Sequence, residues 1–270
     1  MIPTLRADLA ELGHDALRGA AAHPGLWYDR YLRQLLTRGE RPPDSGAPVP
    51  AHIGRVAAMR PAGQAAFYDA AYRRWRAKLT DLEVQPQEMG VQHRLAAGHG
   101  GKNATETGLT LHHTYGVPYI PGSSLKGVAA AFAARRLNDL WNEKSEAYRT
   151  LFGTTDSAGY ITFLDALPKP GEWWLLPDVL TVHHREYYRA AVREPGEAGP
   201  PLPPPLPPAD WDSPTPVTFL SAQGTFLLAL LPAPGAEAWA DVAYEIVKLA
   251  LAEMGVGGKT SSGYGRLTMP

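Results

Sequence analysis

The chain of 270 residues contains no cysteine. Disulfide bonds and thiolate metal sites are therefore excluded, and the only metal ligands left are histidine and the carboxylates. No apolar run reaches the ~18 residues that a membrane-spanning helix needs, and the first twelve residues carry Arg6, Asp8 and Glu11 instead of an apolar secretion signal. From these absences we expect a cytoplasmic protein without a membrane partner.

An excess of charge of one sign is also lacking, because 26 Lys and Arg stand against 27 Asp and Glu, for a formal net charge of −1. This balance does not indicate a protein that is basic over its whole surface. A binding site for a polyanion would have to be a local patch in which backbone amides assist a few cations. Hydrophobic residues make up 44% of the chain, which is enough for a packed core.

The spacing of hydrophobic residues predicts two regions. Residues 1–85 are expected to be helical and to pack on the rest, with a helix over 62–79 in which Phe67, Ala71, Trp75 and Leu79 lie four apart. Residues 86–270 are expected to form the main domain, with a proline-rich insertion at about 168–215 that holds eight prolines between 194 and 208.

The main domain shows an alternation of strand and helix patterns. A helix is expected to start at Ser123 or Ser124, which are good N-cap residues, and Gly224 is expected to mark a turn or bulge. The resulting order is β-α-β-β-α-β, which is typical of the ferredoxin-like (RRM-like) α+β fold. The predicted elements are strands over 90–97, 160–166, 217–231 and 263–269 and helices from 123 and over 236–254.

A loop near the C-terminus combines five glycines with cations and hydroxyls. Its Gly-Lys-Thr triplet does not indicate a P-loop, because Glu253 occupies the first glycine position and the loop follows a helix instead of preceding one. Glycines let backbone amides approach an anion, and a cap after a helix requires only one of them. The candidate RNA-binding residues are Gly257, Gly258, Lys259, Thr260, Ser261, Ser262, Gly263, Tyr264, whose ring could stack on a base, and Arg266.

A second candidate segment leads into the helix predicted at Ser123 or Ser124. Free amides at a helix N-terminus favour an anion. Lys126 lies in the first turn, where its positive charge interacts unfavourably with the helix dipole, at a cost of ~0.3–1 kcal/mol that a bound phosphate would reverse. Lys102, in a polar glycine-rich loop over 98–107, is a further candidate cation.

Two motifs, residues 118–127 (Pro-Tyr-Ile-Pro-Gly-Ser-Ser-Leu-Lys-Gly) and 257–266 (Gly-Gly-Lys-Thr-Ser-Ser-Gly-Tyr-Gly-Arg), together resemble the RAMP superfamily of CRISPR proteins. The closer resemblance is to RAMP subunits of the type III-B Cmr complex, and it covers roughly residues 89–270. It implies a ferredoxin-like fold that binds the 3′ part of a CRISPR RNA, and possibly target RNA, near one end of the complex. The implied neighbours are the backbone RAMP subunit, a second cap RAMP subunit and a small helical subunit. Lys126 and Gly257 to Gly265 would face the guide backbone.

The resemblance leaves two classes of function open. The backbone subunit of such complexes cleaves RNA with an aspartate between its first strand and first helix, whereas residues 98–122 here contain only Glu106 as an acid, so we expect no catalytic residue. Processing members of the superfamily use histidine without metal, so a metal-independent endoribonuclease is the alternative. Adjacent histidines on a strand point to opposite faces, and no His-x-x-x-His spacing indicates a metal or other cofactor. The candidate histidines are His93, His99, His112, His113, His183 and His184.

Overall fold

The computed structural model describes residues 23–30, 48–59, 62–101, 105, 107–184, 187 and 207–270. Lys102, Glu106 and most of the proline-rich stretch over 194–208 lie outside these residues. Among the described helices, none is both long and apolar enough to span a membrane.

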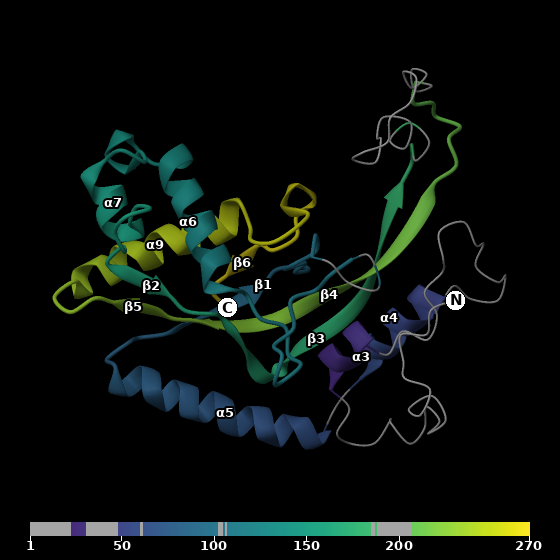
Figure 1. Cartoon of the computed structure of the whole chain (residues 1–270), viewed down its shortest axis with the longest axis horizontal. Helices are drawn as coiled ribbons and strands as arrows, with labels where there is room; N and C mark the ends of the chain where they lie inside the picture. The colour runs from purple at the N-terminus through teal and green to yellow at the C-terminus, as the bar shows by residue number, and fades with distance from the viewer. Residues whose placement is uncertain are drawn as a thin grey trace.

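A four-stranded antiparallel sheet forms the centre of the molecule (Figure 1). Its strands, in spatial order, are β3 (Leu167–Val182), β4 (Thr215–Leu228), β1 (Gln87–Val91) and β6 (Leu267–Thr268). A second, two-stranded sheet pairs β2 (Ile161–Phe163) with β5 (Leu230–Pro232), and these strands lie next to β3 and β4 in the chain. The prediction of a mixed α+β fold with an antiparallel sheet is therefore confirmed.

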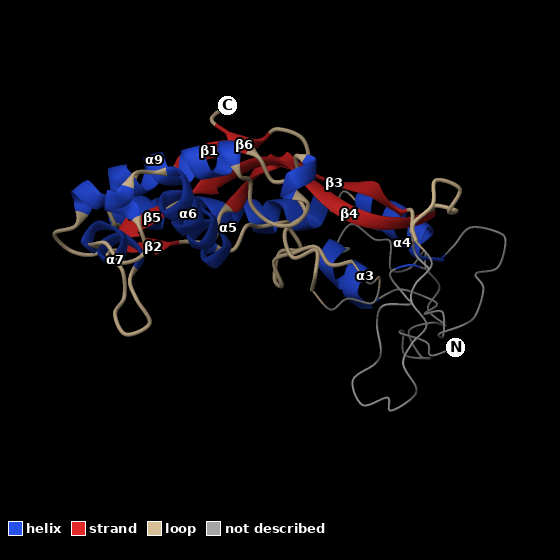
Figure 2. Ribbon diagram, turned by 90° about the horizontal axis from the view of Figure 1, so that it is seen from above, coloured by secondary structure: helices blue, strands red, loops and turns tan. Residues whose placement is uncertain are grey.

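Helices cover this sheet in separate groups (Figures 1 and 2). Helix α6 (Gly122–Arg136) packs against α9 (Glu237–Glu253), with α7 (Glu146–Phe152) beside α6. Helix α5 (Ala62–Asp81) contacts β3 and runs along the opposite side of the sheet. Helices α3 (Pro24–Arg30) and α4 (Pro48–Ala58) lie beside the far part of the long β3–β4 hairpin, which α4 contacts on both strands.

Strand β4 is apolar on both faces because it separates two hydrophobic clusters. Phe226 and Leu228 belong to the cluster that includes the buried side chains of α6 and α9. Leu227, between them, belongs with Ala229 to a cluster that includes Leu79 of α5. Successive residues of a strand point to opposite faces, so this segment fills both cores and cannot show the alternation of a half-exposed strand.

The predicted N-cap of α6 is wrong. The helix begins at Gly122, its N-cap is Pro121, and no side chain of the N-cap residue closes the first turn. Instead, the Gly122 amide donates a hydrogen bond to the Asp165 carboxylate at 2.7 Å, from the connection between β2 and β3. The cap therefore comes from a distant part of the chain, which local cap preferences for Ser123 and Ser124 cannot show.

The first part of the segment that the sequence assigns to the proline-rich insertion forms a strand. Residues 167–182, most of them assigned to it by sequence, form β3 and pair with β4. Pro168 and Pro177 are tolerated because β3 is the edge strand of the sheet, where a missing N–H need not break the ladder. The register shifts between Pro168 and Trp173, and Trp173 lies opposite Gly224, which bears out the bulge expected there.

Both strands that flank the glycine-rich loops are shorter than predicted. The first strand ends at Val91. In the rest of the range predicted for it, up to residue 97, Leu95 forms an isolated bridge with Ala222. The last strand spans two residues, because Gly263 and Gly265 adopt positive φ and belong to the loop. The helix predictions over 62–79 and 236–254 are confirmed by α5 and α9 within two residues at each end.

We predict that Gly265→Ala destabilises the protein much more than Gly54→Ala. Gly265 has φ +69°, and a Cβ on it would lie 1.9 Å from the Val256 carbonyl oxygen, whereas a Cβ on Gly54 in α4 meets nothing within 4 Å. We expect Gly265→Ala to lower the free energy of unfolding by about 2–4 kcal/mol. The matched change Gly54→Ala should raise it by about 0.5–1 kcal/mol, because alanine favours helix. Urea unfolding measures both; equal stabilities would contradict this packing.

Candidate nucleic-acid interface

The glycine-rich loop, residues 255–266, joins α9 to β6 and closes on itself through its backbone. The Val256 amide donates to the Gly265 carbonyl at 2.8 Å, and the Tyr264 amide donates to the Lys259 carbonyl at 3.3 Å. The 3₁₀ turn η2 (Thr260–Ser262) forms the tip between these bonds. Positive φ, which the sequence predicted for this loop, is found at Gly255, Gly257, Gly263 and Gly265.

The loop packs against the chain that follows β1. The Gly258 amide donates to the Ala96 carbonyl at 2.9 Å, and the Gly265 amide donates to the Arg94 carbonyl at 2.6 Å. A Cβ on Gly258 would lie 3.0 Å from the Cβ of His99. The glycine-rich loop therefore meets the chain at Ala96 and His99, which the sequence motif does not indicate by itself.

Most amides of the loop are used by the fold. Those of Val256, Gly258 and residues 262–265 donate to backbone carbonyls. Within the described part of the chain, no acceptor is found for the amides of Gly257, Lys259, Thr260, Ser261 and Arg266. The first four of these lie at or beside the tip, so the tip is where an anion could meet several backbone donors, and this is a smaller cradle than the glycine count suggests.

Lys259 at this tip is held over two aromatic rings. Its Nζ lies 5.5 Å from the ring centroid of Phe219 and 5.8 Å from that of Tyr264. Phe219, on β4, is fully buried, and the His99 ring meets it edge-on at 4.9 Å. Burial, and then the nearby Lys259 charge, lower the pKa of His99, so this imidazole is neutral at pH 7.

Tyr264 is fixed through its hydroxyl, which donates to the Asp178 carboxylate of β3 at 2.5 Å. Burial and this carboxylate raise the pKa of Tyr264 to about 12, so the hydroxyl keeps its proton at neutral pH. Its ring also contacts Phe219, at 6.1 Å between centroids. Sequence reasoning found Tyr264 but missed Phe219 and Asp178, because neither is near the loop in the chain.

Arg266 is turned partly into the protein. Its Nε and the Nη1 of Arg94 are buried and have no hydrogen-bond partner among the described residues. The two arginines lie on neighbouring segments, because the Gln92 amide donates to the Arg266 carbonyl at 2.9 Å. Lys259 is therefore the cation of the loop that stands nearest its free amides.

The second predicted segment lies at the start of α6, apart from the glycine-rich loop. Ser123 is exposed there, whereas Ser124 and Lys126 are half-buried. Asp165 already places a carboxylate on the Gly122 amide, so the helix dipole next to Lys126 is offset without a bound phosphate. No described contact joins Lys126 to the loop; α6 packs on α9, whose C-terminal end leads into the loop (Figure 1).

The candidate histidines are dispersed over the described structure. His112 accepts a hydrogen bond from the Thr114 amide and packs on Tyr115 at 4.5 Å, and burial lowers its pKa. His184 pairs with Asp212 at 2.8 Å near the far end of the β3–β4 hairpin. His99 has its side chain against Gly258 of the glycine-rich loop, and His93 lies between Gln92 and Arg94, whose backbones are hydrogen-bonded to the same loop. Among the described residues, no group of three or more His, Asp or Glu is arranged to hold a metal ion.

Comparison with known proteins relates this fold and loop to CRISPR proteins. The chain is 28% identical to "CRISPR system Cmr subunit Cmr6" of Pyrococcus furiosus over 256 residues, which covers 74% of this chain and 72% of the relative. It is 29% identical over 99 residues to the Cmr6 subunit of Saccharolobus solfataricus, covering 36% of this chain and 33% of that protein.

The fold is shared with a chain in the cryo-EM structure of the Type III-B Cmr-beta complex bound to cognate target RNA. The TM-score is 0.58 at 18% identity, with 97% of this chain and 86% of the other covered. A family model for the RAMP superfamily matches residues 50–268, which is most of the chain and includes both motifs. The resemblance seen in the sequence is confirmed, and the chain belongs to the RAMP superfamily.

Proposed function

We propose that this chain is a non-catalytic, RNA-binding subunit of a type III-B CRISPR effector complex. In this role it holds the 3′ part of the CRISPR RNA backbone through the glycine-rich loop. Its partners would be the guide RNA, target RNA, the backbone RAMP subunit, a second cap RAMP subunit and the small helical subunit of a cytoplasmic complex. The similarity to Cmr6 over about three quarters of the chain supports this assignment.

The observation that carries the RNA-binding role is the tip of the glycine-rich loop. It combines the Lys259 ammonium with amides at Gly257 and residues 259–261 that have no described acceptor. The hydroxyls of Thr260, Ser261 and Ser262 stand at the same turn. These groups suit phosphate oxygens and carry no code for a base, which matches a subunit that must accept guides of many sequences.

The strand order supports a ferredoxin-like core for this function. If β2 is counted with β3 and β5 with β4, the four strand segments of the β-α-β-β-α-β unit are β1, β3, β4 and β6 in chain order. Across the sheet they lie in the order second, third, first, fourth. That is the arrangement of the split βαβ fold. We place the helical region at residues 1–85 and the RAMP domain at 86–270, with the insertion confined to residues after 182.

The alternative function is a metal-independent endoribonuclease. The observation that favours it is the position of His99 near Lys259, whose ammonium in turn lies 5.8 Å from the Tyr264 ring, since these are the residue types that such enzymes use. Against it, the Tyr264 hydroxyl is bound to Asp178 and its pKa is about 12, which makes it a poor base. The Nδ1 of His99 is buried and has no hydrogen-bond partner among the described residues, so at most one of its nitrogens could meet a substrate.

We predict that Lys259→Ala weakens binding of single-stranded RNA about tenfold for all sequences alike, the loss expected for one charge-assisted phosphate contact. The slope of log affinity against log salt should fall by about 1, since one phosphate is no longer neutralised. Fluorescence anisotropy at several salt concentrations measures both quantities.

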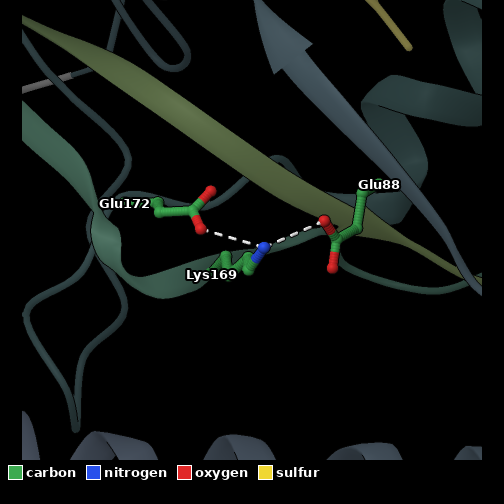
Figure 3. A network of polar contacts seen from close by, with 3 residues as sticks. All are labelled: Glu88, Lys169 and Glu172. Atoms are coloured by element: carbon green, nitrogen blue, oxygen red, sulfur yellow. Dashed lines mark hydrogen bonds and ion pairs between the residues drawn. The ribbon is translucent and has the colours of Figure 1, made fainter. Parts of the chain in front are cut away.

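Lys169→Met is the matched control. The Lys169 ammonium lies 3.2 Å from Glu88 and 2.9 Å from Glu172, so its charge is already paired (Figure 3). Affinity and salt slope should stay at the wild-type values. If Lys259→Ala left the slope unchanged, Lys259 would not be on a phosphate.

We predict that the purified chain binds labelled CRISPR RNA stoichiometrically and leaves it intact, with or without EDTA. Gel analysis of the RNA after incubation measures this directly. Cutting that is lost on substitution of His99, and retained with His184→Gln at the distant hairpin, would contradict the non-catalytic role and support the alternative. His112 and His113 are tested in the same series.

A further inference from the structure

Lys259 has a backbone conformation that is unfavourable for a lysine. Its φ and ψ are +60° and +28°, in the left-handed region that an L-residue with a Cβ adopts at a cost. Glu83 is the only other non-glycine residue with positive φ in the described part of the chain. The loop is rich in glycine, yet a lysine occupies the position where glycine would relieve strain. Such an outlier indicates that the side chain is needed there.

The partners of the Lys259 ammonium are unusual for a lysine. No described carboxylate lies within ion-pair distance of its Nζ; the Phe219 and Tyr264 rings take that place. An aromatic ring attracts a cation through its quadrupole, and it neither neutralises the charge nor fills a hydrogen-bond acceptor site. All three N–H donors of the ammonium therefore remain for an anion.

The two rings are themselves immobilised. Phe219 is fully buried on β4 with the His99 ring edge against it, and Tyr264 is tied to β3 by its hydrogen bond to Asp178. The Asp178 carboxylate is itself engaged, because it accepts hydrogen bonds from the Tyr264 hydroxyl and from the Val179 amide. The arrangement holds the lysine ammonium in one place, which reduces the conformational entropy that a mobile lysine loses on binding.

We propose that Phe219 and Tyr264 are positioning residues for RNA binding. Their rings hold the Lys259 ammonium at the place where it binds a backbone phosphate, and they do so without neutralising its charge. The proposal rests on the proposed function and adds a residue, Phe219, that cannot itself touch the RNA because it is fully buried. The ligand group is a phosphodiester of single-stranded RNA.

The test is a double-mutant cycle on RNA affinity with the full-length chain and a labelled oligouridine. Phe219→Leu, which keeps an apolar side chain, should weaken binding about 2- to 5-fold, the worth of one cation–π contact. The same substitution in the Lys259→Ala background should change affinity less than 1.5-fold, because the cation it serves is gone. Tyr264→Leu is run in parallel, since Tyr264 is only partly buried and this variant remains informative if Phe219→Leu fails to fold.

The outcomes separate this inference from the proposed function. The inference is overturned if Phe219→Leu and Tyr264→Leu weaken binding by the same factor with and without Lys259, because the rings would then act independently of the lysine. It is also overturned if Lys259→Ala weakens binding and neither ring substitution does. If the wild-type chain does not bind the RNA, the proposed function itself fails.

A second comparison tests the strained backbone separately from RNA. Lys259→Gly and Lys259→Ala both remove the ammonium, but only glycine relieves the left-handed conformation. We expect the glycine variant to unfold about 2–4 °C higher than the alanine variant, and both to bind RNA equally weakly. An alanine variant as stable as the glycine variant would show that Lys259 does not have this conformation in solution.

Discussion

The backbone contact between Val256 and Gly265 determines the shape of the candidate site. Their hydrogen bond closes the glycine-rich loop, and the Gly265 amide continues into a bond with Arg94. Only glycine can stand at this crossing, because a Cβ would meet the Val256 carbonyl at 1.9 Å. With the base closed, the tip of the loop lies over Phe219, and Lys259 has its ring partners. The hydrogen bonds of Gly265 to Val256 and Arg94 therefore fix where the loop, and with it Lys259, stands on the sheet.

Lys169 and Lys259 are held in place by different kinds of partner, and only one kind leaves the positive charge available for an anion. Lys169 is held by Glu88 and Glu172, which fix its position but cancel its charge. Lys259 is held by aromatic rings, which fix its position and leave the charge intact. An ion pair stabilises the sheet surface, whereas a ring-held cation is suited to receive an anion from outside. The difference makes Lys259 the best-supported RNA contact in the described part of the chain.

Local patterns predicted the parts of the fold that depend on local interactions. Helices α5 and α9 have apolar residues at helical spacing and were predicted within two residues at each end. Strand β3 was missed because its residues were assigned to the proline-rich insertion at about 168–215, and the prolines within it, Pro168 and Pro177, are acceptable at the edge of the sheet. The cap of α6 by Asp165 and the contact of Lys259 with the Phe219 ring each join residues 40 or more positions apart, so no local pattern reveals them.

The glycine-rich loop as an RNA contact is the central claim, and photo-crosslinking tests it most directly. A guide RNA that carries 4-thiouridine throughout its 3′ part would be bound to the chain and irradiated, and the crosslinked peptides would be sequenced. The account predicts crosslinks in peptides that contain residues 257–266, with Tyr264 the most reactive, and in the adjoining peptide around His99. Crosslinks confined to α5 or to the far end of the β3–β4 hairpin, with none in the loop, would contradict it.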